Sequence, residues 1–288
     1  MAGRLLEVHR FPVKSMRGEA LTEAQLDDTG VAGDRAHALL DVETGKVASA
    51  KDPRRWAALL GFAAAYVDAA SSGAQLVVVL PDGSRVRSDE ADVDARLSDA
   101  LGRSVRLVAT PAAGAVYDDL WPDVEGIAPE EFIADTQTST SDDGRPVSSL
   151  PVGLLAPGTF QDVAPLTILT SASLARAAAL APNGRWDTRR FRPNLVVDVE
   201  GEGFLENEWT GRRIAVGEVV VEVLAATPRC VMTTLPQDDL PADRAILQTI
   251  ARHNRVEVPG VGKFACLGAY AAVVEAGRVA VGDAVRLL

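Results

Sequence analysis

Cysteine and histidine are scarce in this chain, which has two cysteines and three histidines among 288 residues. Cys230 and Cys266 are too few for a disulfide framework, and neither lies in a CxxC pair that could hold zinc or an iron–sulfur cluster. His9, His37 and His253 have no metal-ligand spacing, so neither a histidine-based metal site nor a Ser-His-Asp triad is expected. The scarcity of cysteine favours a reducing, cytoplasmic setting.

Long apolar runs are also absent. No window reaches the ~18 uninterrupted apolar residues of a membrane-spanning helix, and the N-terminal segment MAGRLLEVHRFPVKS contains no apolar run typical of a signal peptide. The net charge is −11 at pH 7, which argues against partners such as nucleic acid or an anionic membrane. Local groups of arginine and lysine are informative against this acidic background.

Several common site motifs are missing. The chain has no GxGxxG after a strand, no HExxH and no GxSxG. The segment PGVGKF at 259–264 matches a phosphate loop only in part, because Glu257 replaces the first glycine of that pattern and Phe264 replaces its Ser or Thr. We therefore expect no nucleotide site there.

Short strands dominate the secondary structure that the sequence predicts. Short apolar or alternating runs bounded by turn residues indicate strands, among them 5–11, 66–68, 75–80, 85–87, 166–170, 195–199 and 219–225. Helices are expected at 88–101, from 171 or 173 to about 182, and at 241–253. The alternation of strands and helices in a doubly wound sheet is missing, so we predict a mostly β (α+β) fold with a barrel-like architecture.

Two short segments place cationic and amide groups where a strand meets a loop. Arg192 and Asn194 lie in RRFRPN, just before a hydrophobic strand, and Arg229 and Cys230 lie in TPRC, just after another. Functional sites gather at such junctions. We expect Arg229 to favour the thiolate form of Cys230, which is the nucleophilic form and a soft ligand for a metal such as molybdenum.

Each of these residues also has a purely structural interpretation. A lone cysteine is most often buried and inert, and Cys266 in FACLGAYAAVV fits that description better than Cys230. Arg192 could be a surface cation, and Asn194 could bond only to backbone groups. In the functional interpretation, Arg192 grips a phosphate and Asn194 bonds to a heterocycle.

Two N-terminal motifs are weak by themselves. FPVKS supplies Lys14 and Ser15 just past a strand, where a solvated turn is the simplest interpretation. Asp34 and Arg35 form a neighbouring pair of opposite charge, which most simply is a surface ion pair.

Four segments together resemble those of a known family. FPVKS, FRPNLVVD, PRCVMTT and the closing VAVGDAVRLL are similar to those of MOSC-domain proteins with an N-terminal MOSC β-barrel domain, in the group that contains the mitochondrial amidoxime-reducing component and its bacterial relatives. The resemblance implies a MOSC-type barrel, a smaller N-terminal β-barrel domain and a few peripheral helices. It divides the chain into an N-terminal domain at 1–110, an irregular connection at 111–165 that is rich in Pro and Gly, and a MOSC domain at 166–288.

The resemblance also implies a molybdenum cofactor (molybdopterin) whose metal coordination is completed by a protein cysteine. By motif position, this catalytic ligand is Cys230. The same resemblance assigns the other cofactor contacts to Lys14, Ser15, Arg35, Thr170, Ser171, Arg192, Asn194, Pro228 and Arg229. Pyridoxal phosphate has been associated with the family, but no group of residues around Lys14 supports it.

Three functions remain open from the sequence. The first is an oxidoreductase that reduces an N-hydroxylated small molecule at molybdenum, the second a sulfur carrier with a persulfide on Cys230, and the third a carrier of the cofactor without turnover. The many cationic positions favour the first and the third. Thr227 replaces the second cysteine of the mitochondrial proteins, and we expect no ferredoxin-like domain of the kind that some bacterial relatives append. A reductase would therefore need a separate electron-donor protein of the reductase, ferredoxin or cytochrome type.

Overall fold

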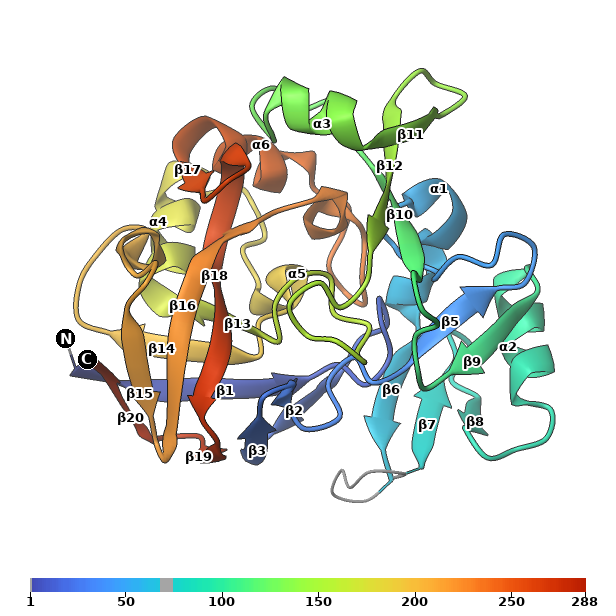
Figure 1. Cartoon of the computed structure of the whole chain (residues 1–288), viewed down its shortest axis with the longest axis horizontal. Helices are drawn as coiled ribbons and strands as arrows, with labels where there is room; N and C mark the ends of the chain where they lie inside the picture. The colour runs from blue at the N-terminus through green and yellow to red at the C-terminus, as the bar shows by residue number, and fades with distance from the viewer. Residues whose placement is uncertain (1, 68–74) are drawn as a thin grey trace.

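Strands form most of the regular structure in the computed structural model, which describes residues 2–67 and 75–288 (Figure 1). They are grouped in one large sheet, which closes into a barrel, and in four small sheets. Helices are few, and the longest in the described part of the chain have ten residues. The prediction of a mostly β fold with a barrel and a few peripheral helices is confirmed.

Seven strands form the barrel. In order around the ring they are β13 (Leu166–Thr170), β14 (Leu195–Val199), β1 (Ala2–Arg10), β20 (Ala284–Leu287), β15 (Arg213–Val216), β16 (Val219–Pro228) and β18 (Gly262–Glu275). β18 pairs with β16 on one side and with β13 on the other, which closes the ring. The first strand of the chain is thus built into a barrel whose other strands all come from the C-terminal half.

Alternating side chains and one glycine explain the course of the two long strands. Val219, Val221 and Val223 of β16 are fully buried in the barrel core, as expected for every second residue of a strand with one buried face. Gly268 of β18 has a φ of 84°, and a Cβ atom there would lie 2.7 Å from the backbone oxygen of Ile168. Glycine is required where β18 passes from β16 to β13.

Small sheets and helices pack beside the barrel around a second core. They are β5 (Ala38–Asp41) with β9 (Val105–Val108), β6 (Ala63–Tyr66) with β7 (Leu76–Val79) and β8 (Arg85–Arg87), α1 (Pro53–Trp56), the 3-10 helix η1 (Ala57–Gly61) and α2 (Val93–Leu101). Met16, Phe62 and Leu97 are buried in this core. The predicted hairpin of β7 and β8 is confirmed. The predicted strand at 66–68 lies earlier, in β6, and Asp68 is outside the described residues.

The remaining elements connect or cover the barrel. They are β2 (Glu19–Leu21), β3 (Glu23–Asp27), β4 (Gly30–Val31), β17 (Arg255–Val258), β19 (Gly277–Ala280), α4 (Ser171–Leu180), α5 (Thr188–Phe191), α6 (Arg244–His253) and the 3-10 helices η2 (Leu205–Glu208) and η3 (Val231–Thr234). β19 pairs with β3, so an N-terminal and a C-terminal segment share one small sheet.

Two predicted helices begin later than expected. α2 begins at Val93 and not at Ser88, because the Ser88 hydroxyl accepts a hydrogen bond from Leu76 N at 3.0 Å and so belongs to the neighbouring hairpin. α6 begins three residues late, because the carboxylate of Asp243 caps it by accepting a hydrogen bond from Ala245 N at 3.0 Å.

The expectation that 111–165 is irregular is wrong for its middle part, which contains β10 (Val116–Leu120), α3 (Glu130–Thr136), β11 (Gln137–Thr140) and β12 (Pro146–Pro151). Serine and threonine hide the strand pattern, but their hydroxyls are satisfied internally. Ser148 of β12 is fully buried and accepts a hydrogen bond from Trp121 Nε1 at 2.8 Å. The three strands form one antiparallel sheet, β10-β12-β11. The division of the chain at 110 and 165 stays a prediction.

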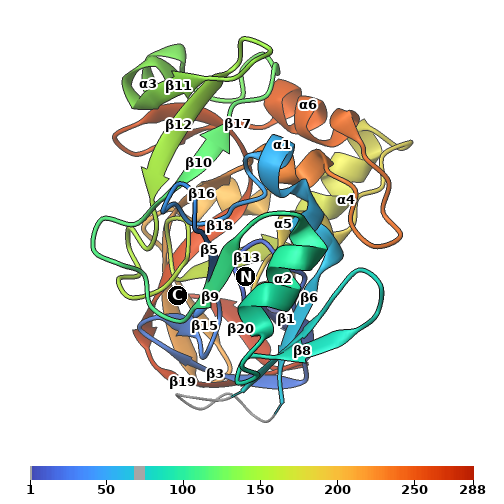
Figure 2. The ribbon, with the colours of Figure 1, turned by 90° about the vertical axis from the view of Figure 1, so that its right-hand side faces the viewer.

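The elements meet around the loops in the middle of the molecule. In Figures 1 and 2, α3 and β11 project at the top, α4 and α6 lie together on the barrel side, and α2 covers the small N-terminal sheets. The loop after β1, the loop after β12 and the segment around α5 come together between the barrel and the small sheets (Figure 1). Four of the residues predicted to form the site lie in these segments, namely Lys14 and Ser15 after β1 and Arg192 and Asn194 after α5.

Candidate functional site

A cationic cavity lies between the barrel and the N-terminal sheets. Seven residues predicted from sequence line it: Lys14, Ser15, Arg35, Arg192, Pro228, Arg229 and Cys230. The lining includes six cationic side chains and one carboxylate, that of Asp162, in a chain whose net charge is −11. Such a concentration of positive charge in an acidic protein is suited to an anionic ligand.

Backbone strain is concentrated at this cavity. Ser15, Arg35 and Arg192 have φ values of 65°, 44° and 52°, and they are three of the four non-glycine residues with positive φ in the described part of the chain. Such conformations are unfavourable for residues with a side chain and are found disproportionately at functional sites. The fold therefore holds these three residues in costly conformations, each with its side chain at the same cavity.

Two arginines stack on one aromatic ring at the cavity wall. The guanidinium carbons of Arg192 and Arg35 lie 4.2 and 4.6 Å from the ring centre of Phe11. Arg35 pairs with the buried Asp34 and donates a hydrogen bond from Nη2 to Arg192 O at 3.3 Å. Arg192 Nη2 is buried and has no hydrogen-bond partner within residues 2–67 and 75–288.

The surroundings of Arg192 disfavour its positive charge. Burial, followed by repulsion from Arg35, lowers the pKa of Arg192 to about 9. An anion bound beside it would oppose both effects and would accept the free hydrogen bond of Nη2. Arg192 is therefore the clearest candidate for an anion contact among the residues predicted from sequence.

A cluster of lysines and carboxylates forms another part of the wall. Lys14 pairs with Asp162, donates a hydrogen bond to Phe160 O at 3.0 Å and lies 4.4 Å from the ring centre of Tyr117. Lys51 lies 3.1 Å from Asp162 Oδ2 and 3.3 Å from Asp119 Oδ2. The two lysines and two carboxylates balance one another in charge.

The pKa values of this cluster reflect the competition between burial and pairing. Burial lowers the pKa of Lys14 despite the attraction of Asp162. Burial also opposes the charge on Lys51, but Asp162, Tyr117 and Asp119 together raise its pKa well above the ordinary value. Burial raises the pKa of Asp119. Lys51 is thus a firmly charged group within the cavity wall.

The thiol of Cys230 is not activated by Arg229, contrary to the sequence-based expectation. Burial raises the pKa of Cys230 to about 11, and Lys51 is the cation that most lowers it. Arg229 lines both cavities together with Cys230, but its guanidinium group is bound by backbone oxygens. Arg229 donates hydrogen bonds to Leu267 O at 2.7 Å and to Phe191 O at 2.9 Å. In the structure the free thiol is therefore protonated at neutral pH, and a bound metal would have to displace its proton.

Cys230 also lines a second cavity, which is mainly apolar. This pocket has a volume of about 360 Å³, within the range of ~300–1,000 Å³ typical of small-molecule sites. Trp121, Phe132 and Phe264 form part of its wall. Cys230 and Lys51 line both cavities, and the enclosed part of the cationic one measures about 90 Å³. The thiol thus lies where an anion site adjoins an apolar pocket.

Three residues predicted to contact the cofactor, Thr170, Ser171 and Asn194, do not line the cationic cavity. Thr170 caps α4, its side chain accepting a hydrogen bond from Ser173 N at 3.0 Å, and Ser171 donates to Asp198 at 2.7 Å. Neither residue lines the cationic cavity. Asn194 accepts a hydrogen bond from Thr167 N at 3.1 Å and Arg35 Nη1 approaches it at 3.4 Å, which matches its backbone-bonding interpretation and places it behind the wall.

Ser15 lines the cavity, but its hydroxyl oxygen is already used, since it accepts a hydrogen bond from Ala50 N at 3.0 Å.

Sequence reasoning missed Lys51, Asp119 and Asp162. Each lies in a short segment without a recognised motif, and only the fold brings the three together. Lys51 and Asp119 each adjoin another charged residue and Asp162 follows a glutamine, so no local signal is common to the three.

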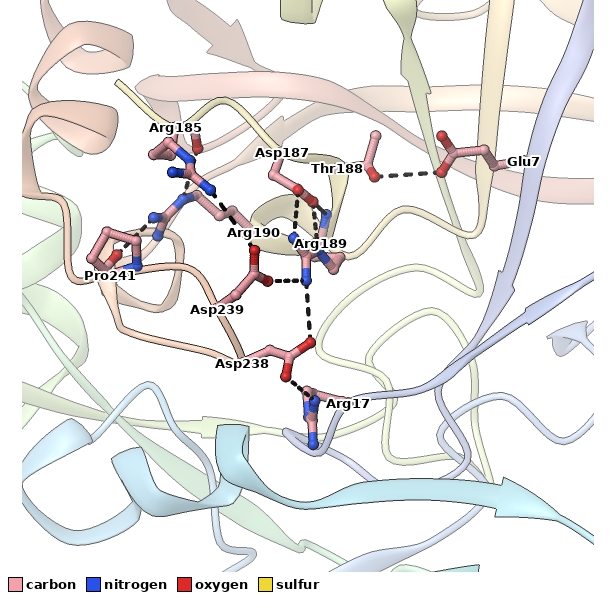
Figure 3. Close-up of polar contacts among 10 residues, drawn as sticks. All are labelled: Glu7, Arg17, Arg185, Asp187, Thr188, Arg189, Arg190, Asp238, Asp239 and Pro241. Carbon is pink, nitrogen blue, oxygen red and sulfur yellow. Dashed lines mark hydrogen bonds and ion pairs between the residues drawn. The ribbon is translucent and has the colours of Figure 1, made fainter. Parts of the chain in front are cut away.

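A polar network joins the segment just before Arg192 to the segment that follows Cys230 (Figure 3). Arg190 is almost fully buried and donates hydrogen bonds to Pro241 O at 2.7 Å and to Thr233 O at 3.2 Å. Arg189 pairs with Asp239 at 2.7 Å. The buried arginine therefore fixes α5 against η3, and with it the relative positions of Arg192 and Cys230. The exposed ion pairs add little to this.

The chain matches two family models. Residues 2–116 match the MOSC N-terminal beta barrel domain, and residues 157–286 match the MOSC domain. This chain belongs to the MOSC-domain family. The MOSC match begins just before β13, and its barrel is completed by β1 from the N-terminal match.

Several curated proteins are similar to this MOSC-domain chain. The mouse mitochondrial amidoxime-reducing component 1 is 30% identical over 137 residues, which are 45% of this chain and 38% of the relative. The human mitochondrial amidoxime reducing component 2 is 31% identical over 130 residues, 44% of this chain and 38% of the relative. The matched region thus spans well under half the length of these relatives.

Solved structures resemble this MOSC-domain chain more distantly. The YuaD protein from Bacillus subtilis is 10% identical, with 99% of this chain and 94% of that chain covered and a TM-score of 0.46. YiiM from Geobacillus stearothermophilus is 19% identical, with 43% and 54% covered and a TM-score of 0.29.

Two further properties of the MOSC-domain chain concern metal-binding groups and membrane-spanning helices. Within the described ranges, no group of three or more His, Cys, Asp or Glu side chains is arranged to hold a metal ion. None of the helices that the structure describes is long and apolar enough to cross a membrane.

Proposed function

We propose that this chain binds the molybdenum cofactor in the cationic cavity through Cys230 and is an oxidoreductase that reduces N-hydroxylated small molecules. Electrons would come from a separate donor protein of the reductase, ferredoxin or cytochrome type. The amidoxime-reducing names of the curated relatives support this reaction class. The observation that carries the proposal is the position of Cys230, between a cavity suited to an anion and an apolar pocket suited to a small molecule.

The residues of the cavity fit the cofactor, which is an anionic pterin phosphate that binds metal through sulfur. Arg192 supplies a buried guanidinium nitrogen with no hydrogen-bond partner among the described residues, which a phosphate oxygen would satisfy. Lys14 and Arg35 add positive charge from the N-terminal region. Cys230 offers a soft sulfur ligand, the type that molybdenum accepts.

The protein's own residues would bind and orient the reactants. When bound, the molybdenum supplies two-electron redox chemistry, and removal of oxygen from an N–OH group consumes two electrons and two protons and releases water. Lys51 stabilises the thiolate of Cys230 by its charge, against the burial that disfavours it. The apolar wall around Trp121, Phe132 and Phe264 excludes water and holds the substrate.

The two other functions receive less support from the geometry. A sulfur carrier needs only an accessible thiol and leaves the cationic lining around Cys230 without a role. A cofactor carrier without turnover leaves the adjoining apolar pocket without a role.

Elemental analysis tests the proposal. We expect molybdenum in the purified protein, or after reconstitution with the cofactor, at a level approaching one atom per chain. We also expect such protein to reduce an N-hydroxylated compound when given a chemical electron donor. Absence of molybdenum after reconstitution would contradict the proposal, and sulfur found on Cys230 by mass spectrometry would then support the persulfide carrier.

Replacing Arg192 with alanine is expected to weaken cofactor binding by ~1.5–3 kcal/mol, the range for a hydrogen bond to a charged group. This corresponds to a loss of affinity of about ten- to one-hundred-fold. The measurement is a titration of cofactor-free protein, followed by molybdenum content after gel filtration. Arg176→Ala is the matched control, because Arg176 lies on the exposed side of α4. Equal cofactor retention in the two variants would contradict the assigned role of Arg192.

A further inference from the structure

The apolar pocket beside Cys230 contains one acidic residue. Its wall is formed mainly by aromatic and aliphatic side chains, and Leu154 and Leu155 are more than half exposed in spite of their size. Exposed apolar side chains next to a cavity are typical of a site that receives an apolar ligand. Asp119 also lines the pocket, although only 4% of its surface is exposed. A buried carboxylate in such a wall is costly unless its oxygens are bonded.

One oxygen of Asp119 is bonded and the other is not. Oδ2 lies 3.3 Å from Lys51 Nζ, whereas Oδ1 is buried and has no hydrogen-bond partner in the described parts of the chain. An unsatisfied buried acceptor carries its full desolvation cost and binds a donor when one is supplied. The structure thus provides an acceptor without a donor at a pocket that is otherwise apolar.

Asp119 shares this pocket with Lys51 and Cys230. Lys51 Nζ lies 3.3 Å from Asp119 Oδ2, and Lys51 also lines the cationic cavity together with Cys230. Tyr117, two residues before Asp119 on β10, also lines the pocket, while Asp118 between them pairs with Lys46 Nζ at 2.7 Å. Alternation along the strand therefore directs Asp119 toward the pocket and Asp118 away from it.

We propose that Asp119 is a specificity-determining residue, which accepts a hydrogen bond from an N–H or O–H group of an uncharged ligand whose apolar body fills the rest of the pocket. The charges of Lys14, Lys51, Asp119 and Asp162 already balance, so an uncharged ligand leaves the cluster neutral. A donor bound to Asp119 places the polar end of the ligand beside Cys230 and its apolar end toward Leu154 and Leu155. That this ligand is the substrate rests on the proposed function, whereas the binding preference does not.

Two ligands of nearly the same shape, one with and one without a hydrogen-bond donor, test whether the pocket prefers a donor. Benzamide carries an N–H donor where acetophenone carries a methyl group, and both are uncharged. In the purified full chain we expect benzamide to bind at least about tenfold more tightly than acetophenone, as for a hydrogen bond to a charged acceptor. Dissociation constants from NMR titration give this ratio, and the molybdenum content of each sample is measured alongside.

Three variants assign the preference to Asp119. Asp119→Leu removes both acceptor oxygens and should lower the affinity ratio to below about threefold, while Asp119→Asn, which has nearly the wild-type shape, should at least halve it. Asp118→Asn is the matched control and should leave the ratio unchanged. Equal affinities of the two ligands for the wild-type chain, or an unchanged ratio in the Asp119 variants that fold, would overturn the proposal. A preserved ratio in protein that takes up no molybdenum would support the role of Asp119 and contradict only the proposed function.

Discussion

Replacing Cys230 with serine is expected to lower the molybdenum content of the purified protein by at least about tenfold and to abolish reduction of N-hydroxylated compounds. Even the loss of a residue that only supports a metal ligand typically costs about 10–100-fold in metal affinity, and loss of the ligand itself should cost no less. Serine offers a hard oxygen in place of a soft sulfur, and its hydroxyl deprotonates far less readily. The fold should be retained, because Cys230 is only partly buried and serine has nearly the same volume.

Cys266→Ser is the control for this experiment. Cys266 is fully buried among apolar residues and does not line either cavity at Cys230. Burial raises its pKa to about 12, so it is an inert thiol. A serine there should cost ~1–3 kcal/mol of stability for the buried hydroxyl and leave turnover intact. Full activity in Cys230→Ser, or lost turnover in a folded Cys266→Ser protein, would show that the wrong cysteine has been assigned.

Asp162→Asn is expected to destabilise the fold more than any surface substitution, because it removes the carboxylate between Lys14 and Lys51. Breaking a buried ion pair by removing one partner costs ~3–5 kcal/mol. The Asp162 side chain is 28% exposed, so we expect about 2–4 kcal/mol at neutral pH, measured by urea unfolding. Lys51 keeps its contact with Asp119, and Lys14 keeps Phe160 O and the ring of Tyr117.

The same substitution has a predictable pH dependence. Burial alone would raise the pKa of Asp162, but the charges of Lys14 and Lys51 hold it well below its ordinary range. A lowered pKa in the folded state adds stability above the ordinary carboxylate pKa of ~4, and this contribution is lost as the pH falls below that value. The difference in unfolding free energy between wild type and Asp162→Asn should therefore be largest near neutral pH and shrink between about pH 4 and pH 2.

Asp89→Asn provides the comparison for a surface ion pair. Asp89 pairs with Arg87 at 3.0 Å, and both side chains are nearly half exposed. Its loss should leave the free energy of unfolding nearly unchanged, because an ion pair in solvent contributes little to stability. An effect of Asp162→Asn equally small, or one that is the same at pH 3 and pH 7, would show that the buried lysines do not depend on this carboxylate.

Much of the fold could be predicted from local sequence patterns. The runs that became β13, β14 and β16 are short, apolar, rich in the β-branched residues Val, Ile and Thr and bounded by turn residues, a combination that favours strands. The errors arose where a polar side chain bonds to a distant part of the chain. Ser88 bonds to the neighbouring hairpin instead of capping a helix, and Ser148 is satisfied inside a strand that looks like a loop in the sequence.

Some residues of the site could also be predicted from the sequence, whereas others could not. Arg192 and Cys230 stand in motifs that mark them as unusual, and the structure brings both to one cavity. The role of Arg229 was misjudged, because burial dominates the pKa of Cys230 and the Arg229 guanidinium group bonds to backbone oxygens. Lys51 and Asp162 could not be found from the sequence, since their importance comes from being opposite each other across more than a hundred residues of chain.

The place of β1 between β14 and β20 has a consequence for how this chain is made. Gly3 pairs with Val199 and with Val285, so the start of β1 lacks strands on both sides until almost the whole sequence has been translated, and only its end can pair early, with β2. Such non-local pairing gives a high contact order and slow folding. During this interval the edge of β1 is open to pairing with other chains, as are those of any barrel strands already formed. Expression of this protein should therefore depend on chaperones and on slow translation more than the stability of the finished barrel would suggest.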